Sequence, residues 1–238
     1  MAQDHYYTET LGAAVTISSG KLEIYCATQW PQHVRNSVSA VLDLDPSEIR
    51  VKPTVIGEDL DGKIWFPSLV ASQAALAAVL SRKSVKLVFS RQEDFLFTVK
   101  SAPVRVRYRT ILDENNALKA MNVRILINAG AYSPLIDEIV DRMTIAAIGP
   151  YHCPEFRIET YALRTNLPPM GAFSGWGESQ VSFALENHIA RLITAKNLPP
   201  VEWKKSTILD RGRITHTGGE LKQDRRYDEL FDRVCTAS

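Results

Sequence analysis

Residues 21–51 read KLEIYCATQW PQHVRNSVSA VLDLDPSEIR V, and the clearest secondary-structure pattern of the chain lies in this segment. Apolar and polar side chains alternate over residues 21–26, which is the pattern of a strand with one buried face. Apolar residues then recur at helical spacing over residues 34–42, and Asp45-Pro46 ends that run because a proline disfavours helix in the residue before it. Residues 49–51 begin another short apolar run. The stretch therefore predicts a strand, a helix and a second strand.

The same alternation of periods continues along the chain. Residues 68–82 are rich in alanine and predict a helix with a closely packing face, and residues 85–89 predict the next strand. Ser90 and Glu93 have the spacing of a capping box, which begins a helix. The runs 104–111 and 118–128 are both strand-like and are joined by turn residues, so we expect a long hairpin there.

The C-terminal part mixes strand and helix patterns. Residues 157–163 predict a strand that extends the sheet of the hairpin, and the apolar residues from Val181 to Leu192 mark an amphipathic helix. A short helix is expected over residues 227–234. These patterns predict an α+β fold of mixed sheets with packed helices, organised as a strand-helix-strand portion, residues 1–100, and a hairpin-sheet portion with helices, residues 101–238.

The composition is that of an ordinary globular protein, with 45% hydrophobic and 23% charged residues in 238. Lysine and arginine total 28 against 27 acidic residues, so the net charge of +1 gives no field that favours nucleic acid or anionic lipid. Neither the start of the chain nor any later run predicts a signal or membrane segment. The three cysteines are scattered and odd in number, which predicts buried thiols in a reducing compartment and a cytoplasmic location.

Two loops and one glutamine are candidates for ligand binding. Gln29 follows a strand and precedes a helix, where polar groups commonly face a ligand, although most buried side-chain amides bond to backbone and that alternative is the commoner one. Residues 57–63 also lie between a strand and a helix, but the carboxylates of Glu58, Asp59 and Asp61 favour an exposed acidic turn over a phosphate site.

The segment Gly171–Gly177 leads directly into the amphipathic helix and is the best anion-site candidate on local grounds. Trp176 within it is either a stacking platform for a flat ligand or a hydrophobic anchor. Arg142 lies four residues after Glu138, so its alternatives are an ion pair along one helix and a buried guanidinium that binds a substrate oxygen. The histidines show no metal spacing, and no nucleophile and base pair supports a hydrolase.

Four short stretches in register resemble one family of proteins: Gln3-Asp4-His5-Tyr6-Tyr7-Thr8-Glu9-Thr10, Ser90-Arg91-Gln92-Glu93-Asp94, Asn128-Ala129-Gly130-Ala131-Tyr132 and Thr165-Asn166-Leu167-Pro168. They are similar to the first half of the molybdopterin-binding domain of the xanthine dehydrogenase and aldehyde oxidase family. The resemblance extends from residue 3 to about residue 195.

The resemblance implies part of an oxidoreductase that hydroxylates an aldehyde or an N-heterocycle on a molybdopterin cofactor. It implies as partners the missing C-terminal half of the domain and iron–sulfur and FAD modules. The catalytic glutamate of the family belongs to that later half, so we expect no catalytic residue in this chain and no activity of the chain by itself. Apolar surface left uncovered by the missing half predicts a homo-oligomer.

By the same resemblance, Gln29 stands where the family has a glutamine that donates to an oxo ligand of molybdenum. The other expected cofactor-binding residues are Leu60, Asp61, Ser174 and Gly175. The expected substrate-binding residues are Arg142, Trp176 and Ile64.

The chain also departs from the family. Where the family has G-G-G-F-G-G-K-E, residues 57–64 read GEDLDGKI, so carboxylates replace glycines and Ile64 replaces a glutamate that would bind a purine. Ser174 replaces an arginine. We therefore expect a loop that has moved or lost its cofactor contact, and purine is disfavoured as substrate. A diverged, non-catalytic binding or assembly module that keeps the fold is the alternative.

Overall fold

The computed structural model describes residues 3–18, 20–58, 60–223 and 226–237. The chain forms two compact units, and each is described by itself. Unit 1 comprises residues 1–101 together with two short returning segments, 130–135 and 166–175. Unit 2 comprises residues 102–129, 136–165 and 176–238.

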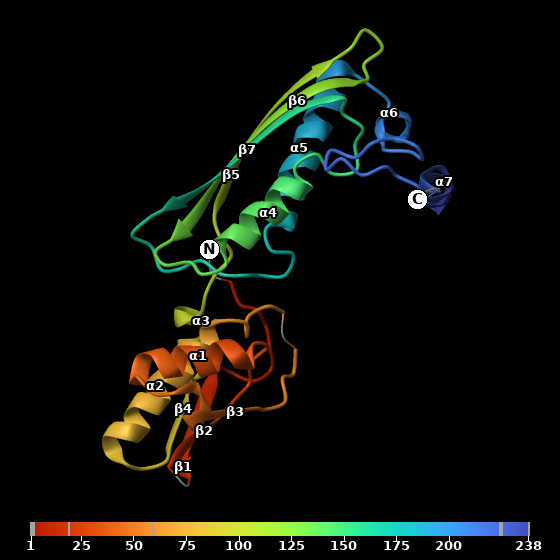
Figure 1. Cartoon of the computed structure of the whole chain (residues 1–238). Coiled ribbons are helices and arrows are strands. Elements are labelled where there is room, and N and C mark those ends of the chain that lie inside the picture. The colour runs from red at the N-terminus through yellow and green to blue at the C-terminus, as the bar shows by residue number, and fades with distance from the viewer. Residues whose placement is uncertain (1–2, 19, 59, 224–225, 238) are drawn as a thin grey trace. The chain divides into compact units, whose positions relative to one another are not determined.

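Unit 1 is built on a four-stranded sheet (Figure 1). Its elements are β1 (Gly12–Ser18), β2 (Lys21–Cys26), α1 (Pro31–Leu42), the 3-10 turn η1 (Pro46–Glu48), β3 (Ile49–Pro53), α2 (Phe66–Ser81), β4 (Val85–Val88) and α3 (Arg91–Phe97). The strand order is β3-β2-β1-β4. β2 and β3 are parallel, whereas β1 is antiparallel to both of its neighbours. The predicted strand, helix and strand are therefore confirmed, and the β2–α1–β3 crossover makes the parallel pair.

The core of unit 1 lies between this sheet and helices α1 and α2. Val15 and Ile24 of the sheet and Val34 and Val38 of α1 are fully buried. The face of α2 that packs here carries small side chains, namely Ala71, Ala74, Ala75 and Ala78. Because these side chains are short, the helix backbone approaches the sheet closely.

β1 was not predicted from the sequence, although it is a central strand of unit 1. Its burial alternates, with Ala13 and Val15 inside. The strand begins with Gly12 and two alanines, which have little preference for strands and give a weak hydrophobic pattern. Pairing with β2 and β4 on both sides stabilises it instead.

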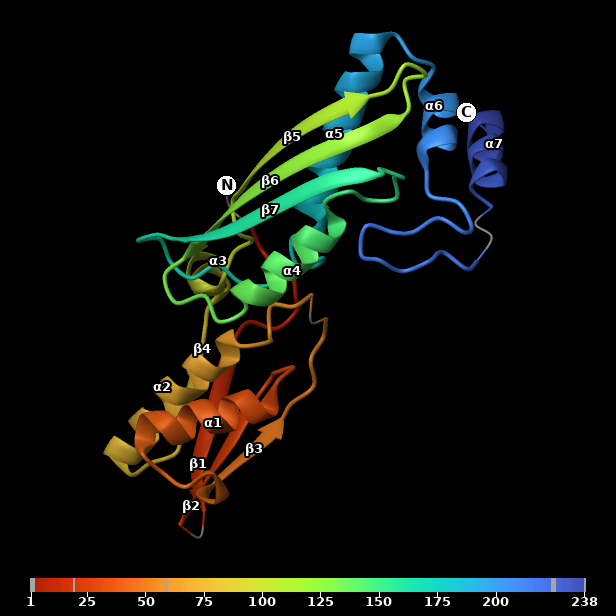
Figure 2. The ribbon, with the colours of Figure 1, turned by 45° about the horizontal axis from the view of Figure 1, so that its top comes forward.

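Unit 2 is built on a three-stranded sheet whose order is β5-β6-β7 (Figure 2). Its elements are β5 (Val104–Leu112), β6 (Leu118–Gly130), α4 (Ile136–Ala146), β7 (Glu155–Arg164), α5 (Glu178–Lys196), α6 (Pro200–Thr207) and α7 (Tyr227–Ala237). Helices α4 and α5 cover one face of the sheet, where Val123, Ile125 and Ile127 of β6 are fully buried. The predicted hairpin, the third strand and the helices α5 and α7 are confirmed.

Helix α6 was not predicted, because Pro199-Pro200 indicated only the end of the preceding helix. A proline stops a helix that arrives from its N-terminal side, but it is well suited to the first position of a new one. Pro200 is the first residue of α6. With this addition, the α+β class with mixed sheets and packed helices is confirmed.

The cysteine prediction needs one correction. Cys26 and Cys153 are buried thiols, whereas Cys235 in α7 is exposed because that helix presents most of its side chains to solvent. Over the described residues, no helix combines the length and apolar character needed to cross a membrane. The same residues include no group of histidine, cysteine and acidic side chains that could hold a metal ion.

Two of the short stretches quoted for the resemblance contact each other. Thr165 Oγ1 donates to Asn128 Oδ1 at 2.8 Å, and the Ala131 amide donates to the Leu167 carbonyl oxygen at 3.0 Å. Gly130 has a φ of +68°, and a Cβ atom there would overlap the carbonyl oxygen of Pro168. The glycine is therefore required both by its backbone conformation and by this close approach.

Replacement of Gly130 tests that requirement. Gly130→Ala should lower the free energy of unfolding by about 1 to 3 kcal/mol more than Gly20→Ala, because only the first forces a methyl group against backbone. Gly20 is the matched control, since its φ is +77° and nothing lies within 4 Å of an added Cβ. Urea unfolding measures both variants, and equal losses of stability would contradict the packing argument.

Candidate functional site

Gln29 is held in unit 1 by two hydrogen bonds to one residue of the acidic loop, which comprises residues 57–63. Gln29 lies between the end of β2 and the start of α1 and is half-buried. Its amide N–H donates to the Lys63 carbonyl oxygen at 2.8 Å, and its side-chain Oε1 accepts the Lys63 amide N–H at 3.1 Å. The glutamine and the end of the acidic loop are thus bound to each other through backbone and side chain together.

The second of these bonds fixes which end of the Gln29 carboxamide faces outward. A backbone N–H can only donate, so the atom that faces Lys63 is the oxygen and the NH₂ group is directed elsewhere. Among the residues that the structure describes, none accepts a hydrogen bond from Nε2. The Gln29 oxygen therefore bonds to backbone, as in the commoner alternative, and a role of its NH₂ group at a ligand stays a prediction.

The side chain of Lys63 lies in the interior of unit 1 and is 0% exposed. Its ammonium donates to Glu9 Oε1 at 2.7 Å and to the Glu9 carbonyl oxygen at 3.0 Å, and it lies 4.5 Å from the centre of the Tyr7 ring. Burial lowers the pKa of Lys63, while Glu9 opposes that shift. Partial burial alone would raise the pKa of Glu9, but the hydrogen bond from Lys63 holds it below its usual value.

The acidic loop is attached to the N-terminal segment at both ends. Glu9 Oε2 accepts the Gly57 amide at 3.1 Å, and Gly62 packs so closely on Tyr7 and His5 that no Cβ fits. Between these points Glu58 is exposed, as expected for an acidic turn. Asp59, the next carboxylate of the loop, lies outside the described residues.

Leu60 and Asp61, both expected at the cofactor, are half-buried and have φ values of 39° and 65°. L-residues in this left-handed region cost roughly 1 to 2 kcal/mol each, with asparagine and aspartate tolerating it best. The loop therefore keeps a backbone conformation that suits glycine, although glycine is absent from these two positions.

The same N-terminal segment contacts the segment that precedes α5. His5 Nε2 lies 3.0 Å from the Ala172 carbonyl oxygen, and its ring centre is 4.1 Å from that of Phe173. Burial lowers the pKa of His5, and its Nδ1 is buried without a hydrogen-bond partner. His5 thus contacts both candidate loops of unit 1. Farther along the second loop, Ser174 is exposed and Gly175 is half-buried with a φ of +86°.

Asp94 of α3 binds this N-terminal segment. Its Oδ1 accepts the Tyr7 hydroxyl at 3.0 Å and the Leu11 amide at 3.3 Å, and burial raises its pKa. Arg91 donates to the Thr8 carbonyl oxygen at 2.6 Å and lies 3.5 Å from Asp94 Oδ2. The stretches around residues 3–10 and 90–94 therefore bind each other, which was not predicted from the sequence.

Arg142 and Trp176 are neighbours in unit 2. The guanidinium lies 5.3 Å from the centre of the indole ring, within cation–π distance. Its ion pair is with Glu178 at 3.5 Å, not with Glu138, because the start of α5 lies beside α4. The Arg142 side chain is 51% exposed, so the prediction of a buried guanidinium is wrong.

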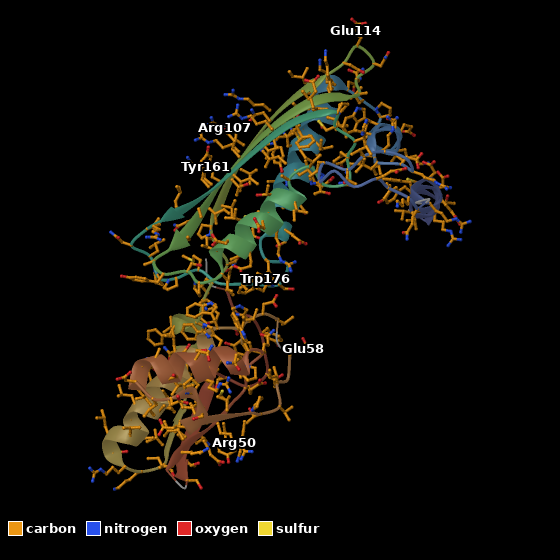
Figure 3. All side chains as sticks on the ribbon, in the orientation of Figure 1. Arg50, Glu58, Arg107, Glu114, Tyr161 and Trp176 are labelled. Carbon is orange, nitrogen blue, oxygen red and sulfur yellow. The ribbon has the colours of Figure 1, made fainter. Side chains whose placement is uncertain are left out.

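Trp176 lies in a sharply bent segment labelled in Figure 3. Its φ is 47°, and it is flanked by glycines with φ values of 86° and 93°. Met143 of α4 fills the space where a Cβ of Gly177 would lie, so the backbone next to Trp176 packs closely on α4. Ile64 is half-buried in unit 1. The roles expected for Gln29 at the cofactor and for Ile64, Arg142 and Trp176 at the substrate stay predictions.

Comparison with known proteins identifies the family to which this chain belongs. A family model described as a molybdopterin cofactor-binding domain matches residues 1–208. The chain is 31% identical over 218 residues to a probable xanthine dehydrogenase component of Bacillus subtilis, with 90% of this chain and 29% of that protein covered. It is 33% identical over 221 residues to a xanthine dehydrogenase of Drosophila subobscura, with 92% and 16% covered. The chain thus spans less than a third of these relatives.

Solved structures agree on the fold. An aldehyde oxidoreductase from Desulfovibrio gigas superposes with a TM-score of 0.85 at 23% identity, over 99% of this chain and 26% of that one. A quinoline 2-oxidoreductase from Pseudomonas putida gives a TM-score of 0.84 at 22% identity, over 99% and 31%. At these identities the likeness concerns the fold alone.

Removing one partner of the Lys63–Glu9 pair should cost more stability than removing the other. Glu9→Gln should lower the free energy of unfolding by about 3 to 5 kcal/mol, because it leaves a fully buried ammonium without its counter-charge. Lys63→Met should cost less, since the Glu9 carboxylate left behind is 35% exposed and can be hydrated. Urea unfolding at pH 7 measures the difference. Glu58→Gln, an exposed change in the same loop, is the control, and a larger loss for Lys63→Met would refute the asymmetry.

Proposed function

Because this chain belongs to the molybdopterin cofactor-binding domain family, we propose that it forms part of the cofactor pocket of a molybdenum hydroxylase that oxidises an aldehyde or an N-heterocycle. The observation that carries the proposal is the orientation of Gln29, whose oxygen is bound to Lys63 and whose NH₂ group is left to donate. When bound, the cofactor supplies the redox centre at which a carbon is hydroxylated.

The hydrogen-bond donors of unit 1 near Gln29 fit a molybdopterin cofactor. An anionic, oxygen-rich cofactor needs N–H donors, and Gln29 Nε2 is held ready as one. Trp65, which directly follows Ile64, has a buried Nε1 without a hydrogen-bond partner. Lys63 takes no direct part in this fit, because its ammonium is enclosed by Glu9 and Tyr7; it positions Gln29 through its backbone.

The substrate side is proposed from three residues. Trp176 offers an aromatic face, Arg142 lies over that ring at 5.3 Å, and the half-buried Ile64 offers only apolar contact. An apolar residue at position 64 leaves the hydrogen-bonding groups of a purine without a partner there, which costs binding. We therefore propose an aldehyde or a less polar heterocycle as the substrate class.

The family resemblance assigns the catalytic glutamate to a part of the domain that this chain does not match. We propose that the remaining half of the cofactor domain and its catalytic glutamate, with iron–sulfur and FAD modules as electron acceptors, complete the enzyme. The chain spans 29% of the Bacillus subtilis relative and 16% of the Drosophila one, which leaves room for such parts. Self-association and a cytoplasmic location remain predictions of the sequence.

A non-catalytic binding or assembly module is the second candidate, and the acidic loop favours it. Glu58 and Asp61 bring carboxylates to a loop in which Gly57 and Gly62 are the remaining glycines. A carboxylate about 4 Å from an anionic cofactor would cost about 4 kcal/mol at an intermediate dielectric. Whether the loop still borders a cofactor is therefore the point that separates the two functions.

Gln29→Glu tests the catalytic proposal. The new carboxylate still accepts the Lys63 amide, but its outward atom is a charged acceptor in place of a donor, so affinity for the cofactor should fall by about tenfold or more. The chain is purified with the polypeptide that supplies the rest of the domain. Molybdenum is measured by mass spectrometry and pterin by fluorescence after oxidation.

The matched control is Gln32→Glu, the same change on an exposed face of α1 three residues away. It should leave the molybdenum and pterin contents unchanged. A wild-type complex that is free of both metal and pterin would count against the proposed function, and so would equal contents in the Gln29 and Gln32 variants.

Glu58→Gly/Asp61→Gly decides between the two candidate functions. If the loop borders an anionic cofactor, removing two carboxylates should raise cofactor retention, by about fivefold for each kcal/mol of repulsion removed. Metal and pterin contents after dialysis measure the retention. Unchanged retention would favour the binding or assembly module.

A further inference from the structure

The face of the β5-β6-β7 sheet opposite to α4 and α5 carries a concentration of arginines. Side chains along β5 alternate, so every second residue points to this outer face. Figure 3 shows Arg107 and Tyr161 on the side of the sheet away from the two helices. We call the set of its exposed guanidinium residues the arginine face; they are Arg105, Arg107, Arg109, Arg124 and Arg157.

Two members of the arginine face are opposite each other in the sheet. The register of the hairpin pairs Arg107 directly with Arg124. Like charges at directly opposite positions destabilise a sheet. Within the described part of the chain, no ion pair offsets the charges of Arg105, Arg107 and Arg109. The repulsion between these arginines therefore destabilises the sheet, and a negatively charged partner would relieve it.

The arginine face contains a shallow hollow. A volume of about 300 Å³ is lined by Arg107, Arg109, Asn122, Arg124, Arg157 and Glu159. Glu159 is the one carboxylate of this lining, and it already pairs with Arg157 at 2.7 Å. The hollow thus has an excess of positive charge, and a carboxylate already binds one of its guanidinium groups, that of Arg157.

Apolar side chains adjoin the arginines on the same sheet. Ile111, Tyr161 and Leu163 are 60%, 43% and 47% exposed, and the Arg124 guanidinium lies 5.3 Å from the centre of the Tyr161 ring. Arginine together with aromatic and aliphatic side chains is typical of the core of protein interfaces, whereas surfaces for phosphate backbones are more uniformly basic. The composition therefore favours a protein as the occupant.

We propose that the arginine face is a docking surface for an extended, carboxylate-rich protein segment. On β5 the arginines recur at every second residue, a spacing of about 6.7 Å. An extended segment with an acidic residue at every second position has the same spacing, so its carboxylates meet successive guanidinium groups. Arginine binds carboxylates in a bidentate geometry, which fixes the register of such a segment. The proposal does not depend on the molybdenum cofactor.

The test uses the whole chain and a fluorescein-labelled ten-residue peptide of alternating glutamate and serine. Fluorescence anisotropy in 50 mM salt should show saturable binding. A peptide of alternating glutamine and serine should bind at least tenfold more weakly. Arg107→Gln/Arg124→Gln should weaken binding of the glutamate peptide at least fivefold, while the melting temperature of the variant stays the same or rises because the like-charge pair is gone.

Arg50→Gln/Lys83→Gln is the matched control, because it removes the same net charge from exposed positions of unit 1. It should change binding less than twofold. The proposal is overturned if the wild-type chain does not bind the glutamate peptide, or if the control double variant weakens binding as much as the arginine-face variant. It is also overturned if a 20-nucleotide single-stranded DNA binds the arginine face at least tenfold more tightly than the peptide does.

Discussion

A fully buried ammonium group needs a negative partner, and in unit 1 this requirement determines the contacts of Lys63. The partner is Glu9, whose two carboxylate oxygens bind the Lys63 ammonium and the Gly57 amide. The N-terminal segment must therefore lie against the acidic loop. Because the backbone of Lys63 is in turn bonded to Gln29, the direction of the glutamine side chain depends on the same ion pair.

Several residues of the short family-like stretches bind one another. Tyr7 donates to Asp94, Arg91 binds the carbonyl oxygen of Thr8, and Thr165 binds Asn128. These contacts join segments that are far apart along the chain. Support of this kind allows the acidic loop to change its composition while Gly62 and Lys63 keep its end in place. Retained support around an altered loop is compatible with both candidate functions.

Charge is distributed unevenly over a chain whose net charge is only +1. Carboxylates gather in the loop after β3, and guanidinium groups gather on the outer face of the unit 2 sheet. Averaging over the whole chain hides both features. Net charge governs long-range attraction to nucleic acid and membranes, whereas specific docking depends on local groups such as Arg107 and Arg124.

Local pattern determined most of the elements, since a period of two or of 3.6 residues is a property of neighbouring side chains: β2, α1, β3, the β5–β6 hairpin and α5 follow from it. The place of Gln29 between a strand and a helix made it a candidate, and the family resemblance gave it a specific role. Tertiary structure alone decided the central place of β1, the burial of Lys63 against Glu9, and the pairing of Arg142 with Glu178. The two side-chain contacts join residues 36 or more positions apart, and the place of β1 depends on which strands pair with it. The order of residues along the chain does not tell how far apart such groups lie in space.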